Sequence, residues 1–160
     1  MNTVDREHGP DLLDDPAGWA AWCEHRGFAP APSRRTDARL VREALRELLW
    51  ANAGHANPPK SAGRFSESSV VDSAAFEAGL TVRFAPARVE ARRGDALGAV
   101  LAQAFTAMAD GSWARLKACP GERCGWAYYD RSVNASSAWC SMKVCGGRAK
   151  ARAYYRRTKA

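Results

Sequence analysis

The 160-residue chain has room for one ordinary domain, or for a domain of about 100 residues with a small appended module. It contains no run of about 18 apolar residues, and its opening stretch, MNTVDREHGPDLLDD, lacks the basic and apolar regions of a signal peptide. Composition therefore argues against a membrane protein and against secretion, and we expect a cytoplasmic protein that contacts no membrane.

Charge is distributed unevenly along the chain. Residues 1–110 carry 13 Lys and Arg against 15 Asp and Glu, whereas residues 111–160 carry 11 against 2, so the net charges are −2 and +9. A near-neutral body with a basic tail is typical of proteins that bind polyanions. We therefore predict an N-terminal domain over residues 1–111 and a C-terminal module over residues 112–160.

A short amphipathic helix is predicted near the N-terminus. Pro16 stands at a favourable first position, and Trp19, Trp22 and Cys23 follow at offsets of three and four, up to a stop at Gly27. Cys23 on this apolar face is interpreted as a core residue rather than as a nucleophile. A proline-rich turn, FAPAPS, separates this helix from the next.

The strongest helical pattern of the body runs from about Thr36 to Ala51, with Thr36 or Asp37 as the predicted N-cap. The stripe expected to face the core consists of Leu40, Val41, Ala44, Leu45, Leu48 and Leu49, and the opposite face of Arg42, Glu43, Arg46 and Glu47. Residues 52–69 are rich in Gly, Pro, Ser and Asn and predict an exposed, mobile loop, in which His55 is interpreted as solvated.

A hairpin and a third helix complete the predicted body. LTVRFAP, residues 80–86, alternates Leu80, Val82 and Phe84 inward, and RVEARRG is its expected partner strand, with Val89 inward. Residues 94–111 predict a helix with this buried face: Leu97, Val100, Leu101, Ala104, Phe105 and Met108. Helices with a small sheet predict a mainly helical α+β domain.

Four of the five cysteines lie in two close pairs in the basic tail. Four residues separate Cys119 from Cys124, fifteen residues follow, and Cys140 and Cys145 repeat the first spacing. Two such pairs suit one zinc ion held tetrahedrally by four thiolates. Because the protein would fill every coordination position, this zinc is expected to be structural rather than catalytic.

Other uses of the four sulfurs remain open at this point. Buried or unrelated thiols, a redox role and a [2Fe–2S] cluster all employ cysteines, whereas disulfides are disfavoured in a reducing compartment. Zinc is preferred because free cysteines seldom cluster as two pairs.

Alternation in SWARLKAC, residues 112–119, predicts a strand that leads into the first pair, and Gly121 and Gly125 permit tight turns around its second cysteine.

The pattern C…CGWAYYDRS…WCSMKVCGGRAKARAYYRR resembles the CGNR zinc-finger family, which forms the C-terminal module of bacterial proteins with an ABATE-type N-terminal domain. These proteins are regarded as candidate stress-induced transcription regulators. The matching residues are Cys119, Cys124, Tyr129, Asp130, Ser132, Trp139, Cys140, Ser141, Met142, Cys145, Gly146 and Arg148. The body resembles the ABATE domain in its Asn2-Thr3 pair and in residues 12–22, so that the resemblance spans nearly the whole chain.

Three features depart from the family pattern. Gly147 replaces the Asn of the name motif, which removes a side chain able to cap a helix or contact a partner. The loop VNASSAW lacks the basic residues that the family places before the Trp, so a nucleic-acid contact from this loop is not carried over. The short apolar strand that precedes Asn-Thr in the family is not present before Asn2, so either a strand is missing or the natural start lies upstream.

A basic helix is predicted from about Gly147 to Lys159. Arginine and lysine on such a helix neutralise phosphates, and a few could reach base edges in a major groove. The expected DNA contacts are Arg148, Lys150, Arg152, Arg156, Arg157 and Lys159. About 45 residues have too little core to fold alone, so zinc is expected to fold this module. The small core over the site is predicted to contain Trp126, Tyr128 and Trp139.

These features predict a zinc-containing, DNA-binding transcription regulator that responds to stress or to a ligand and associates with the nucleoid. The N-terminal domain is expected to sense a small-molecule effector or to form a homodimer. The alternatives are a zinc-stabilised protein-interaction adaptor and an RNA-binding protein. We predict no enzyme, because no histidine lies near the cysteines in sequence, no glycine-rich phosphate loop precedes a helix, and Asp130 is interpreted as a turn residue.

Overall fold

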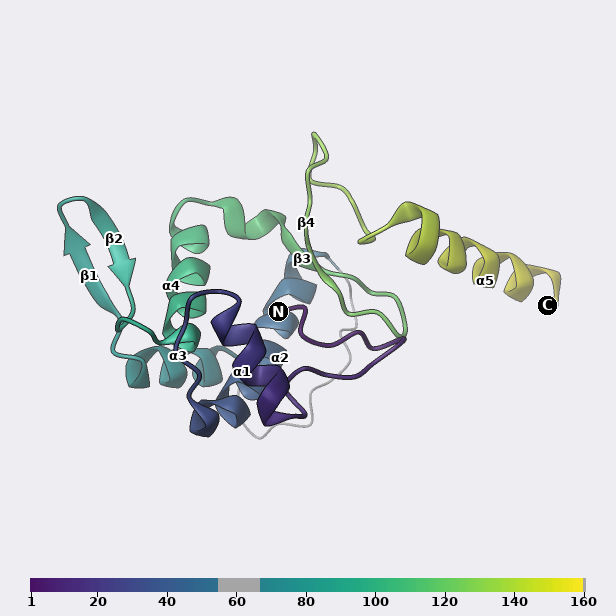
Figure 1. The fold of residues 1–160 in the computed structure, drawn as a ribbon. Helices are drawn as coiled ribbons and strands as arrows, with labels where there is room; N and C mark the ends of the chain where they lie inside the picture. The colour runs from purple at the N-terminus through teal and green to yellow at the C-terminus, as the bar shows by residue number, and fades with distance from the viewer. Residues whose placement is uncertain (55–66, 160) are drawn as a thin grey trace.

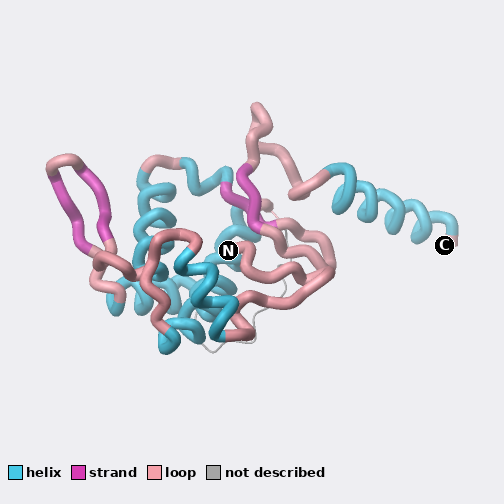
Figure 2. Tube along the Cα trace, in the orientation of Figure 1, coloured by secondary structure: helices cyan, strands magenta, loops and turns pink. Residues whose placement is uncertain are grey.

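A computed structural model describes residues 1–54 and 67–159 of the chain. Within them, a helical body carries one hairpin, and a second hairpin leads to a protruding C-terminal helix (Figures 1 and 2). The helices are α1 (Pro16–Glu24), α2 (Arg35–Asn52), α3 (Glu67–Glu77), α4 (Ala96–Ala109) and α5 (Gly147–Thr158). The strands are β1 (Thr81–Phe84), β2 (Ala87–Glu90), β3 (Leu116–Ala118) and β4 (Ala127–Tyr129). The predicted α+β class is confirmed.

Aspartate side chains mark where two helices of the body begin. The Asp15 carboxylate accepts hydrogen bonds from the backbone of Ala17 and Gly18, and Pro16 follows as the first helical residue of α1, as predicted. Asp95 caps α4 in the same way. Helix α2 instead continues from a short 3₁₀ turn, so the predicted caps, Thr36 and Asp37, lie inside the helix and that prediction is wrong.

Helix α2 packs in two apolar cores. Val41 and Leu45 are buried in a cluster with residues of α1, α3 and α4, in which Cys23 is fully buried as interpreted. Nearer the C-terminal end of the helix, Leu49 and Trp50 pack against Ala118 of β3. Each fully buried large apolar side chain stabilises the fold by roughly 1.5–3 kcal/mol. The body and the second hairpin are therefore joined through one helix.

The face of α2 opposite its apolar stripe is covered. Arg42 and Arg46 are only 7% and 1% exposed, because the N-terminal residues and the second hairpin cover them. The Arg42 guanidinium donates to Thr3 Oγ1 and to Asp11 Oδ1, both at 2.7 Å. Leu40, predicted to face the core, is 59% exposed instead.

Helix α3 begins inside the segment that was predicted as a loop. Residues 67–69 belong to this helix, which packs on α2, so the loop prediction is wrong there. Residues 55–66, including His55, lie outside the described residues. Among the described helices, none combines the length and apolar character that a bilayer crossing requires.

Strands β1 and β2 form the predicted antiparallel hairpin, with Thr81 opposite Glu90 and Phe84 opposite Ala87. Figure 1 shows this hairpin reaching away from the helices. Val82 and Phe84 are therefore 61% and 89% exposed rather than inward.

Helix α4 buries the predicted Leu97 and Leu101, but its last turns pass beyond the core and leave Phe105 and Met108 exposed.

Candidate metal centre and basic helix

The first cysteine pair lies in a tight turn between β3 and β4, residues 119–126, here called the knuckle. Cys119 N donates to Trp126 O at 2.9 Å, and Cys124 N donates to Gly121 O at 2.8 Å. Gly125 has φ +61°, a left-handed conformation that favours glycine. The predicted strand into Cys119 is confirmed only for residues 116–118, because residues 112–115 form a 3₁₀ turn.

The second pair is set by a π-helical turn, Met142–Gly146, immediately before α5. Ser141 Oγ accepts a hydrogen bond from Val144 N at 3.2 Å, and Gly146 N donates to Ser141 O at 3.0 Å. A Cβ atom on Gly146 would lie 2.8 Å from the Met142 sulfur and 3.3 Å from the Trp139 ring, so a larger residue there requires the Met142 side chain to move. Cys145 lies inside this turn, two residues before the helix begins.

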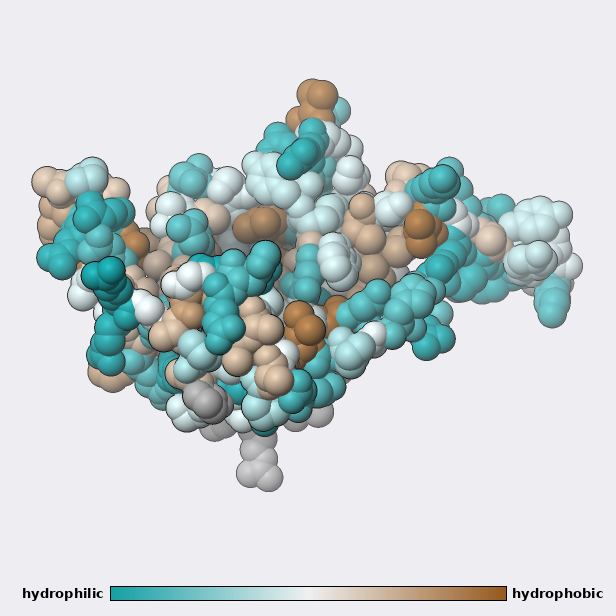
Figure 3. Space-filling view, viewed as in Figure 1, coloured by the Kyte–Doolittle hydropathy of each residue, from teal (hydrophilic) through white to brown (hydrophobic). Residues whose placement is uncertain are grey.

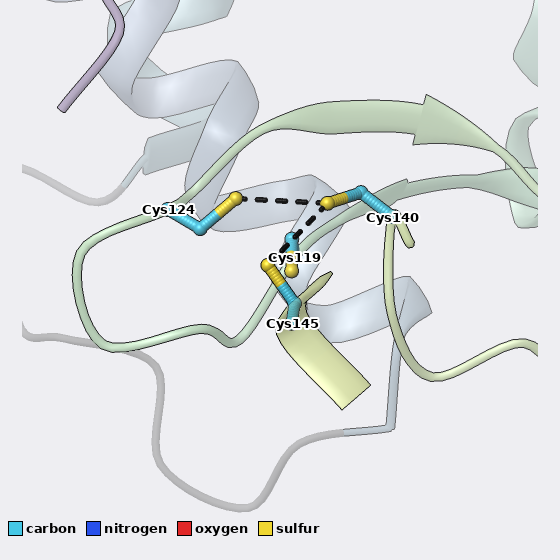
Figure 4. Close-up of side chains that lie close together, drawn as sticks. All are labelled: Cys119, Cys124, Cys140 and Cys145. Carbon is cyan, nitrogen blue, oxygen red and sulfur yellow. Dashed lines mark hydrogen bonds between the residues drawn. The ribbon is translucent and has the colours of Figure 1, made fainter. Parts of the chain in front are cut away.

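The four sulfur atoms all lie within 4.8 Å of one another (Figure 4). The Sγ atoms of Cys124 and Cys140 are 3.6 Å apart, and those of Cys140 and Cys145 are 3.7 Å apart. Thiolates bound tetrahedrally to zinc at about 2.3 Å are about 3.8 Å from each other. All five cysteines of the chain are free thiols. The four predicted cysteines are therefore positioned to hold one structural zinc ion.

The crowding of these thiols is visible in their pKa values. Burial and the neighbouring Cys119 raise the pKa of Cys140 above its ordinary value and that of Cys145 to about 11. At Cys119 burial acts in the same direction, but hydrogen bonds from the backbone of Cys140 and Gly121 outweigh it and lower the pKa. Thiolates are the form that binds zinc, so zinc binding releases protons from this cluster.

Helix α2 holds the backbone of the knuckle. Trp50 Nε1 donates to the carbonyl of Cys119 at 3.3 Å, and the Arg46 guanidinium donates to the carbonyl of Gly125. Asn52 Nδ2 donates to Trp113 O at 2.8 Å and to Leu116 O at 2.9 Å, at the start of β3. No sequence pattern indicates these contacts, because they join residues more than 60 positions apart.

The N-terminal segment also contacts this hairpin. Asn2 Nδ2 donates to Ala127 O, and Ala127 N donates to Asn2 Oδ1, both at 2.8 Å. The amide side chain thus pairs with β4 as a strand backbone would. With Thr3 accepting from Arg42, the Asn-Thr pair noted in the sequence ties the N-terminus to both α2 and β4.

A buried ion pair positions the loop that carries the chain from β4 to Cys140. Lys117 Nζ lies 2.7 Å from Asp130 Oδ2, and both residues are buried. Asp130 also accepts hydrogen bonds from Ser132 and Ser137, and together with Lys117 they hold the pKa of Asp130 well below its ordinary value. Arg115 donates to three carbonyls of the same loop. Asp130 is thus the turn residue that the sequence indicated.

The predicted aromatic core over the site is only partly formed. Tyr128 and Trp139 are half-buried, and Tyr128 Oη donates to Ser137 O at 2.8 Å. Trp126 is 41% exposed, so it does not belong to this core.

Helix α5 is formed as predicted and extends away from the rest of the molecule (Figure 1). None of its residues, all of them described, is buried, and Figure 3 shows a mostly hydrophilic surface over it. Its first turn carries an ion pair between Arg148 Nη1 and Glu7 Oε2 at 2.7 Å. Within the described residues, the other predicted contacts on this helix form no ion pair: Lys150, Arg152, Arg156, Arg157 and Lys159.

Comparisons with known families agree with this architecture. Residues 1–112 match the ABATE family, described as "Putative stress-induced transcription regulator", and residues 115–158 match the CGNR zinc finger. None of the curated proteins compared matches the chain. The resemblance seen in the sequence is confirmed, and the four clustered cysteines agree with the zinc-finger match. The chain therefore belongs to the ABATE family of candidate stress-induced transcription regulators and carries a CGNR zinc finger at its C-terminal side.

Proposed function

We propose that this protein is a DNA-binding transcription regulator in which the zinc site holds α5 against the phosphate backbone. The observation that carries the proposal is the state of α5. The five basic side chains of α5 and that of Lys159, the residue after it, are exposed. Five of these six form no ion pair within the described residues, and the helix starts two residues after the last cysteine. A polyanion can bind these side chains without breaking ion pairs inside the protein.

The structural zinc supports a role in binding rather than in chemistry. Four cysteine ligands leave no coordination position for a water or a substrate. When bound, zinc supplies only a fixed tetrahedral centre that joins the knuckle to the π-helical turn. The family is described as a regulator, and we propose that the protein is not an enzyme.

The N-terminal part, residues 1–111, is proposed to sense a stress signal or small-molecule effector, or to form a homodimer, while residues 112–160 bind DNA in the nucleoid. A cleft of about 580 Å³, with Trp22, Phe28 and Val100 in its lining, supports an effector site in this part of the chain. The exposed apolar face of the β1–β2 hairpin, with Val82 and Phe84, supports pairing of two chains. Sedimentation of the wild type and of Val82→Ser tests the dimer.

The test of DNA binding is a titration of zinc-loaded protein against fluorescent genomic DNA fragments at about 50 and about 200 mM salt. If all six basic residues of α5 contact phosphates, affinity falls by about a thousandfold over this range. An Arg152→Ala/Arg156→Ala variant is expected to lower the slope of log affinity against log salt by about two. The matched control, Arg92→Ala/Arg93→Ala, removes the same charge from an exposed part of the body and is expected to keep the slope.

The titration also separates the alternative functions. An RNA competitor that displaces DNA at equal concentration would favour an RNA-binding protein. Absence of any nucleic-acid binding at low salt, with one zinc per chain, would overturn the proposal and favour a protein-interaction adaptor.

A further inference from the structure

A cleft of about 200 Å³ lies between the knuckle and the first turns of α5. Arg123 of the knuckle and Arg148 and Arg152 of α5 line it, together with Glu122 and two of the zinc-site cysteines. Three guanidinium groups on two separate segments therefore border one cleft. Arginines in this arrangement can bind the oxygens of a phosphate with paired hydrogen bonds.

The charges around the cleft are nearly balanced. A zinc ion with four thiolates carries two net negative charges, and Glu122 adds a third, against the three arginines. An additional anion is nevertheless bound, since the Glu7 carboxylate lies 2.7 Å from Arg148, across 141 residues of sequence. A phosphodiester group carries one negative charge and could replace this carboxylate without changing the balance.

Glu7 is held in place by the turn that contains it. The Asp5 carboxylate accepts hydrogen bonds from Glu7 N at 2.9 Å and from His8 N at 3.1 Å. The intervening Arg6 is paired with Glu43 of α2 at 2.7 Å. The carboxylate is thus presented to α5 by a segment that is attached to the body.

A DNA phosphate has several advantages over the carboxylate at this position. The side chains of Arg148 and Glu7 are 50% and 32% exposed, and exposed ion pairs are weak. Adjacent phosphates of the same DNA strand can engage Arg152, which a single carboxylate does not do.

We propose that Glu7 is an internal phosphate mimic, which occupies Arg148 in the free protein and must leave before Arg148 contacts a DNA phosphate. This inference rests on the proposed DNA-binding function and adds its regulation. The N-terminal segment restrains binding by α5, and any event that moves residues 5–8 away from α5 increases the affinity for DNA.

The test is a thermodynamic cycle with Glu7→Gln, Arg148→Ala and the double variant, each loaded with zinc and titrated with a fluorescent DNA duplex over a range of salt. Glu7→Gln is expected to tighten binding about two- to fivefold and to steepen the salt slope by up to about 0.9. In the Arg148→Ala background, Glu7→Gln is expected to keep only the smaller long-range effect of removing one negative charge, because the competing contact is already lost.

The matched control is Glu122→Gln, which removes a negative charge from the same cleft but from a residue with no ion pair within the described part of the chain. Its effect on affinity is expected to persist in the Arg148→Ala background, as a long-range charge effect does. If Glu7→Gln also acts equally in both backgrounds, or not at all, the inference is overturned while the proposed function stands.

A second experiment tests the role of Glu7 independently of the proposed DNA binding. Inorganic phosphate is titrated while the Arg148 Nε–H signal is followed by NMR in the wild type and in Glu7→Gln. Tighter saturation in the variant shows that Glu7 occupies a phosphate site, even if no DNA binding is found and the proposed function fails. Equal saturation in both proteins, or none in either, rejects the phosphate mimic.

Discussion

Helices α2 and α5 are both rich in arginine, yet they use it in opposite ways. On α2, Arg42 and Arg46 are almost fully buried and hold Thr3, Asp11 and the knuckle backbone. On α5, the arginines are exposed, and in the described residues only one of them forms an ion pair. The difference shows that the neighbours of an arginine decide its role. Those on α2 serve the fold, and those on α5 remain available to a ligand.

The largest expected effect is that of removing zinc, which should unfold α5 but leave α2 folded. Chelation, or Cys140→Ser, should unfold the knuckle and α5, because structural zinc contributes about 10–16 kcal/mol to folding in zinc-finger peptides. Helix α2 should persist, because Val41 and Leu45 pack in the core of the body. Amide NMR spectra check this: signals of residues 116–158 should collapse while those of α1, α2 and α4 stay dispersed.

The control for this experiment is Cys23→Ala, which removes the one cysteine outside the cluster. This variant should still bind one zinc per chain. A dispersed α5 spectrum without metal would show that the helix does not depend on the zinc site.

Replacing a buried arginine is expected to have the next largest effect. Arg46→Met keeps much of the side-chain volume but leaves Gly125 O without its donor and weakens the cluster around Glu43. Breaking a buried pair of this kind costs about 3–5 kcal/mol. Urea unfolding of zinc-loaded protein measures the loss. On the exposed helix, Arg152→Met should change the free energy of unfolding by less than about 0.5 kcal/mol, and equal losses would contradict the comparison.

A smaller effect is expected at the hydrogen bond from α2 to the first zinc ligand. Trp50→Phe removes the donor to Cys119 O, which should lower the free energy of unfolding by about 1 kcal/mol. The zinc affinity, measured by competition with a chelator, should fall in parallel because the knuckle is less well held. Trp126→Phe is the matched control, since that ring is 41% exposed, and it should leave both quantities nearly unchanged.

The smallest expected change concerns the start of α5. Gly147 has helical φ and ψ of −60° and −46°, and a Cβ atom there meets only Met142 O at 3.8 Å. Gly147→Ala should therefore stabilise the helix by up to about 1 kcal/mol, and Gly147→Asn, the family residue, by about a third of that. Circular dichroism on heating measures both. Gly146→Ala should gain less, because its Cβ would lie 2.8 Å from the Met142 sulfur and the exposed Met142 side chain would have to move.

The zinc site was predictable because its signal is local. Two cysteine pairs with equal spacing and a run of basic residues stand within about 40 residues of sequence, and zinc geometry requires little else. The partners of the knuckle were not predictable, because Arg46 and Gly125 are 79 residues apart and Trp50 and Cys119 are 69 apart. Periodicity places Arg46 away from the apolar stripe, but it does not reveal that a second hairpin covers that face.

Two predictions for the body are wrong for the same kind of reason. Alternation along β1 separates Val82 and Phe84 from their neighbours, yet it cannot show whether any element covers that face of the hairpin. Helix α3 was missed because its serines, next to a segment rich in glycine and proline, resemble a loop. Residues whose role depends on packing against distant elements are the ones that the sequence pattern leaves undetermined.

The π-helical turn joins Cys145 directly to α5, so a small tilt at the metal site becomes a larger displacement at the far end of the helix. Twelve residues of α-helix are about 18 Å long, so a tilt of about 10° at Cys145 moves the far end by about 3 Å and the first turn by less than 1 Å. Arg156 and Arg157 therefore respond to a change at the metal, such as its replacement by a larger ion, far more than Arg148 does.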